Sequence, residues 1–81
     1  MIQLSRKQEK IAALLMQGYS NLEIAKELHQ PERTVKGYLG KMFDMFDIND
    51  GYKRVKLAIA LYRRERENVA SKAEGQQASI D

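Results

Sequence analysis

The residues that could do chemistry in this sequence are cations on one side of a predicted helix, in the stretch 31–46, PERTVKGYLGKMFDMF. At about 100° per residue, one face of this helix carries Arg33, Lys36, Gly37, Gly40, Lys41 and Asp44. The opposite face carries Val35, Tyr38, Leu39, Met42 and Phe46. Because glycine has no side chain, a polyanion could approach the helix backbone closely on the cationic face. The pattern predicts a helix that packs on one side and binds a polyanion on the other, with DNA the best candidate.

Size, composition and charge limit the other possibilities. The chain has 81 residues, enough for one small domain, and a net charge of +3. Residues 1–66 hold thirteen Lys or Arg and eight Asp or Glu, so the expected domain is more basic than the whole chain. Without cysteine and with one histidine, the sequence offers no disulfide framework and no metal ligand set. No apolar run reaches the ~20 residues of a membrane span, so we expect a cytoplasmic protein without membrane association.

Capping signals place the first helices that must position the cationic face. Ser5 and Ser20 are each followed three residues later by Gln or Glu, the capping-box pattern of a helix start. We therefore predict helices at about 6–17 and 21–28, the first ending at Gly18. Gln30-Pro31 ends the second, and the third follows at about 32–45.

A fourth helix is predicted at about 52–66, after the turn formers of 47–51. It is apolar on two faces, which requires two partners: the body of the domain and, we expect, the same helix of a second copy. The predicted dimer contact consists of Leu57, Ala60, Leu61 and Arg64. Residues 67–81 contain few large apolar side chains, so we predict a frayed or disordered tail after the domain of 1–66. Without strand-like alternation, the fold class is all-α with four helices.

Two helices joined by a tight turn, the second exposing cations, form the helix-turn-helix arrangement. The spacing of Leu14-Leu15, Gly18, SNLEIAKEL at 20–28 and Thr34-Val35-Lys36 resembles the DNA-binding domain of LuxR/NarL/FixJ-type (GerE-like) regulators, over about residues 4–62. The resemblance implies a homodimer on operator DNA, with the third helix as the reader and the fourth as the dimer contact. It also implies that Ser20 and Asn21 meet phosphates.

Taken together, the predicted DNA-binding residues come from the second and third helices. They are Ser20, Asn21, Lys26, Arg33, Thr34, Val35, Lys36, Gly37, Gly40 and Lys41. The sequence departs from the family at Gly37 and Gly40, where relatives usually have side chains that read bases. Two interpretations stay open: close approach of the backbone to the groove, with specificity from the flanking cations and DNA shape, or poor reading of sequence.

No nucleophile and base pair, Gly-rich phosphate loop or carboxylate cluster indicates an enzyme, and no cofactor is expected. The favoured function is a transcription regulator whose dimer binds a roughly palindromic site in double-stranded DNA. The alternative is a protein-interaction module of the same fold that binds a regulator or an RNA polymerase subunit, and a further rival is a fragment resembling region four of a sigma factor. We expect control through protein amount, a partner or a further domain.

Overall fold

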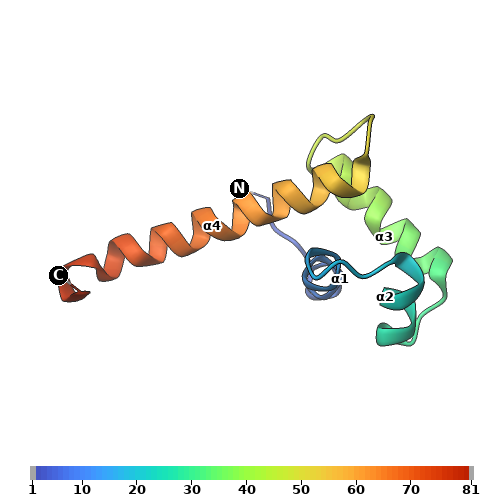
Figure 1. Cartoon of the computed structure of the whole chain (residues 1–81), viewed down its shortest axis with the longest axis horizontal. Coiled ribbons are helices and arrows are strands. Elements are labelled where there is room, and N and C mark those ends of the chain that lie inside the picture. Colours follow the sequence, from blue (N-terminus) through green and yellow to red (C-terminus); the bar gives the residue numbers. More distant parts are fainter. Residues whose placement is uncertain (1, 81) are drawn as a thin grey trace.

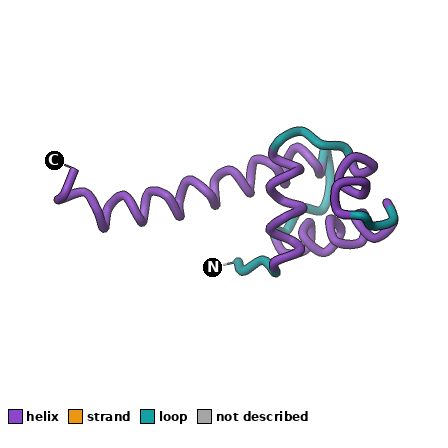
Figure 2. The backbone as a smooth tube through the Cα atoms, turned by 90° about the horizontal axis from the view of Figure 1, so that it is seen from below, coloured by secondary structure: helices purple, strands orange, loops and turns teal. Residues whose placement is uncertain are grey.

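The helices of the chain form a small cluster from which the last helix projects. The computed structural model describes the backbone of residues 2–80 and the side chains of residues 2–67. Its elements are α1 (Arg6–Met16), α2 (Asn21–Leu28), α3 (Glu32–Met45) and α4 (Lys53–Ile80), with no strand in the described residues. Figures 1 and 2 show α1, α2 and α3 gathered beside the first turns of α4, whose remaining length extends away from them. The predicted all-α, four-helix class is confirmed.

Both predicted capping boxes form, and they set where α1 and α2 begin. The Ser5 hydroxyl accepts a hydrogen bond from the Gln8 N–H at 3.1 Å, and the Gln8 side chain accepts one from the Ser5 N–H at 2.8 Å. Ser20 and Glu23 repeat this pair at the start of α2. The hydrogen bonds from Ser20 lower the pKa of the Glu23 carboxyl, because they stabilise its ionised form. Gly18, with φ at 89°, reverses the chain after α1 as predicted.

A corner of three residues joins α2 to α3. His29 adopts the left-handed conformation, with φ at 55°, and the Gln30 N–H then donates to the Ala25 carbonyl at 2.9 Å. Pro31 is the N-cap of α3, where its missing N–H costs no hydrogen bond, and its carbonyl accepts from the Thr34 N–H at 3.0 Å. The corner turns α3 back so that the two helices pack closely on each other.

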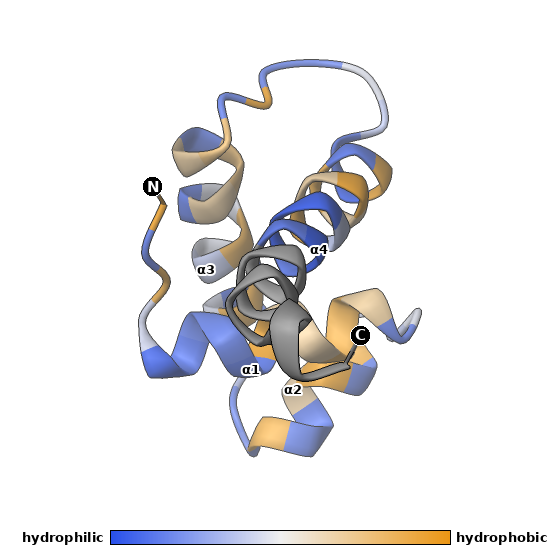
Figure 3. Cartoon of the chain, turned by 90° about the vertical axis from the view of Figure 1, so that its left-hand side faces the viewer, coloured by the Kyte–Doolittle hydropathy of each residue, from blue (hydrophilic) through white to orange (hydrophobic). Residues whose placement is uncertain are grey.

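All four helices contribute to one core. Its buried members are Ile11, Ala12, Leu15, Ile24, Ala25, Val35, Leu39, Met42, Ile48, Leu57 and Leu61. Figure 3, seen along α4, shows α1, α2 and α3 grouped around that helix. The core therefore fixes the direction in which the remaining face of α3 points.

The face of α4 that was predicted to form the dimer contact packs in the core instead. Leu57 and Leu61 are 0% and 1% exposed and belong to the core, so they cannot form a contact with a second molecule. Ala60 is only half-buried, but Arg64 is committed within the chain: its guanidinium lies 2.7 Å from the Glu9 carboxylate and also donates to the Ile2 carbonyl. The apolar residues left exposed on α4 are instead Val55, Ile59 and Tyr62. Both stripes are apolar, so the order of hydrophobic residues alone did not show which one packs.

The helix α4 also continues beyond Arg66, where the sequence predicted its end, and runs to Ile80. The segment contains alanine, glutamate, glutamine and lysine, which have high helix propensity, and no proline. The side chains of 68–81 lie outside the described residues. The frayed or disordered state predicted for 67–81 stays a prediction about the protein in solution.

Candidate nucleic-acid interface

The cationic face of α3 is turned away from the core, as the sequence predicted. Arg33, Lys36, Gly37 and Lys41 are exposed, and Gly40 is half-buried beside them. The core residues Leu39 and Met42 hold the opposite face of the same helix. A rigid helix thus presents cations at fixed positions on the surface, which is the arrangement needed to meet a phosphate backbone.

Besides Gly40, Val35 and Thr34 are also less accessible than the other predicted DNA-binding residues on α3. Val35 is 1% exposed, so its assignment to the DNA surface is wrong: its side chain packs in the core and holds α3 in place. Thr34 is half-buried and lines a hollow of about 220 Å³ with Gly37, Tyr38 and Lys41. The hollow lies on the outer side of α3, where the missing side chain of Gly37 leaves the helix backbone accessible.

Neither Gly37 nor Gly40 is required by the fold of the protein itself. A Cβ atom built at either position meets no heavy atom within 4 Å, so packing would accept a side chain. Neither has a positive φ, whereas Gly18 and Gly51 do. Glycine inside a helix costs about 1 kcal/mol relative to alanine. The fold of the chain therefore does not explain the two glycines. Either a bound partner requires them, or they have no structural role.

The start of α2 supplies hydrogen-bond donors next to this face. Ser20 is exposed and its hydroxyl oxygen is used in the cap, which leaves its O–H free to donate. Asn21 is the first residue of α2 and is half-buried. A helix start of this kind favours anions, because backbone N–H groups and the helix dipole point toward them.

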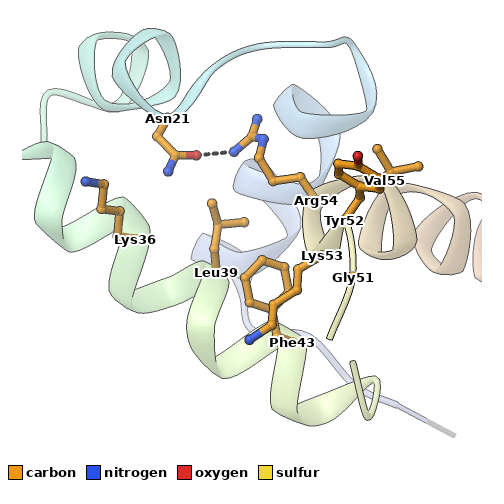
Figure 4. A pocket seen from close by; sticks show the side chains of 9 residues that line it. All are labelled: Asn21, Lys36, Leu39, Phe43, Gly51, Tyr52, Lys53, Arg54 and Val55. Atoms are coloured by element: carbon orange, nitrogen blue, oxygen red, sulfur yellow. Dashed lines mark hydrogen bonds between the residues drawn. The ribbon is translucent and has the colours of Figure 1, made fainter. Parts of the chain in front are cut away.

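Asn21 and Lys36 line one groove, which runs between α3 and the start of α4 (Figure 4). Leu39 and Phe43 form its floor on α3, and Tyr52 and Val55 line it from the other side. The structure thus brings one predicted phosphate ligand from α2 and one from α3 to the same groove. Lys26 is exposed on α2 but lines neither this groove nor the hollow near Gly37.

Arg54 is among the groove residues that sequence reasoning missed. Its guanidinium donates hydrogen bonds to the Asn21 side-chain oxygen and to the Tyr19 carbonyl, and so joins α4 to the start of α2. Such a contact between residues 33 apart in the chain has no local signature. The one available signal was a cation in the first turn of a helix, where the helix dipole favours acidic residues.

Among the described residues, no group of three or more His, Cys, Asp or Glu side chains could hold a metal ion. No helix in the described part is both long and apolar enough to cross a membrane. The features that remain for a function are the cations of α3, the donors of α2 and the groove that Asn21 and Lys36 both line.

Comparison with known proteins agrees with this geometry. The family model described as bacterial regulatory proteins, luxR family, matches residues 2–58. The match spans α1, α2, α3 and the first turns of α4, and so includes the whole candidate interface. No curated protein matches the chain.

Proposed function

The chain belongs to the luxR family of bacterial regulatory proteins, and from this premise we propose that it acts as a homodimer that places α3 in the major groove of operator DNA. Its LuxR-type helix-turn-helix domain makes it a DNA-binding transcription regulator and not an enzyme. In a helix-turn-helix protein the second helix enters the groove while the first braces it across the backbone. In this chain those helices are α3 and α2. Because such a regulator works on chromosomal DNA, we place it in the cytoplasm.

The observation that carries this proposal is the exposed cationic face of α3 beside the donors of α2. Lys36 and Asn21 share a groove, and Arg33 and Lys41 are further exposed cations of α3. Each phosphate that a cation neutralises releases a condensed counterion, so affinity falls as salt rises. If six or more phosphates are contacted, the affinity drops by roughly a thousandfold between about 50 and 200 mM salt.

Binding measured by fluorescence anisotropy against a duplex obtained by selection from random sequence tests the proposal. We expect a steep salt dependence. A flat response, or no binding, would instead favour the alternative of a protein-interaction module, with a regulator or an RNA polymerase subunit as partner. The specific feature behind that alternative is the absence of side chains at Gly37 and Gly40.

The dimer contact that we propose is the exposed apolar stripe of α4, made of Val55, Ile59 and Tyr62. Their exposed fractions are 57%, 47% and 57%, and their spacing of three or four residues places them on one side of the helix. A domain of this size has a small core, so burial of this stripe in a dimer would stabilise it. Two α3 helices related by the dimer axis would then read half-sites about one helical turn apart.

Replacing Ile59 with glutamate is expected to turn the dimer into a monomer without unfolding the domain. The side chain is 47% exposed in the single chain, so a carboxylate there stays in water until a second copy covers it. Sedimentation velocity measures the change in mass, and circular dichroism reports the helix content. An unaltered dimer in the Ile59→Glu variant would show that the stripe is not the contact.

Replacing both Gly37 and Gly40 with alanine is expected to stabilise the fold and weaken DNA binding. Each alanine adds about 1 kcal/mol of helix stability, and neither meets a neighbour within the chain. If the backbone of α3 lies close to the groove, the new methyl groups collide with DNA. Thermal unfolding and anisotropy measure the two effects on one sample. A variant that is both more stable and unimpaired in binding would show that close approach is not the reason for the glycines.

A further inference from the structure

Arg54 makes the only described hydrogen bonds that join α4 to the start of α2, a region the proposed function uses for DNA contact. One guanidinium nitrogen donates to the Asn21 side-chain oxygen and the other to the Tyr19 carbonyl, just before the Ser20 cap. Figure 4 shows the Arg54 side chain reaching across the groove from α4 to Asn21. Both contacts end on the chain segment that enters α2.

The contact determines which way the Asn21 amide is turned. Arginine has donors and no acceptor, so the atom of Asn21 that faces it must be the oxygen. The amide nitrogen then points away from Arg54, toward the α3 side of the groove (Figure 4). Within the described residues this nitrogen donates no hydrogen bond, so its two N–H groups are available to an acceptor from outside. Lys36 lines the same groove.

The position of Arg54 is unusual for the start of two helices, because the dipoles of α2 and α4 repel a cation there. Its hydrogen bonds to the Asn21 side chain and to the Tyr19 carbonyl offset this repulsion. The guanidinium is therefore held by acceptors of the chain itself, and one of these acceptors is the Asn21 amide.

We propose that Arg54 is a positioning residue for DNA binding: it turns the Asn21 amide so that its N–H groups donate to a backbone phosphate. The inference rests on the proposed function, since it names how one phosphate contact of the helix-turn-helix is aligned. Arg54 acts through Asn21. Its effect on affinity should therefore disappear when the Asn21 amide is absent.

A double-mutant cycle on the full chain tests this dependence. The variants are Arg54→Ala, Asn21→Ala and the pair together, with affinity for the selected duplex measured by anisotropy and folding checked by thermal unfolding. We expect each single change to weaken binding by about tenfold and the pair to weaken it by little more than either alone. Arg63→Ala is the matched control, because it removes the same charge from an exposed position of α4 and is expected to change affinity less than twofold.

Arg54→Lys keeps the charge, but a lysine ammonium group lacks the planar guanidinium geometry that reaches both acceptors. This variant should therefore bind DNA more tightly than Arg54→Ala and less tightly than the wild-type protein. It also keeps the test valid if Arg54→Ala does not fold, since the same cycle can be run with lysine. If the affinity losses of the two single variants multiply in the double variant, the proposal is overturned. Arg54 would then contact phosphate by itself. If the wild-type protein binds no duplex, the proposed function fails together with this inference; if it binds and the losses multiply, only this inference fails.

Discussion

Replacing Lys36 with glutamate is expected to lower the affinity for operator DNA by roughly a hundredfold, because a charged contact to phosphate is lost and a repulsion replaces it. Lys36 is exposed, lies at the edge of the groove that Asn21 also lines, and has no partner among the described ion pairs. Substitutions at exposed positions usually change stability by less than about 0.5 kcal/mol, so the unfolding temperature should stay nearly constant. Anisotropy and thermal unfolding measure the two quantities.

Lys10→Glu is the control for this variant. Lys10 is exposed on α1, outside the candidate interface, and the substitution changes the net charge by the same amount. We expect it to weaken binding much less than Lys36→Glu. Equal losses of DNA affinity in the two variants would mean that the overall charge attracts the DNA and that the α3 face is not the binding surface.

Replacing Leu61 with glutamate is expected to unfold the domain. The side chain is 1% exposed and packs in the core between α4 and the other helices, so an ionised carboxylate there would lose its hydration without gaining a partner. The cost is several kcal/mol, which approaches the whole stability of a small domain, commonly about 5–15 kcal/mol. Circular dichroism should show loss of helix and of cooperative thermal unfolding.

The neighbouring residue offers a matched control. Tyr62 is 57% exposed, so Tyr62→Glu should keep the helix content and cooperative unfolding. A folded Leu61→Glu variant together with an unfolded Tyr62→Glu variant would contradict the orientation of α4 described above. Because Leu61 and Tyr62 are adjacent in the chain, comparing the two variants distinguishes the core face of α4 from the proposed dimer face.

The local parts of the fold were predictable from sequence, because their causes are local. The capping boxes of Ser5 and Ser20 marked two helix starts, Gly18 marked a helix end, and Pro31 marked the corner before α3. The helix α2 was predicted at the residues where it is found, and α1 within one residue. The cationic face of α3 followed from the period of its apolar residues.

The remaining features depend on contacts between distant segments. The two apolar stripes of α4 have similar composition, and only packing against α1 and α3 selects Leu57 and Leu61 for the core. Val35 belongs to a motif that the family resemblance associates with DNA, yet its burial shows that it supports the reading helix from behind. Arg54 and Asn21 meet only when α4 folds against the start of α2.

A tethered cleavage reagent tests most directly whether the exposed face of α3 lies against DNA. The chain has no cysteine, so Asp44→Cys on the exposed face of α3 gives one attachment site for iron–EDTA. We predict cleavage in two clusters within the bound site, about one helical turn apart. The same reagent at Glu65→Cys, on an exposed position of α4, should give neither cluster. Cleavage from residue 65 with none from residue 44 would contradict the account.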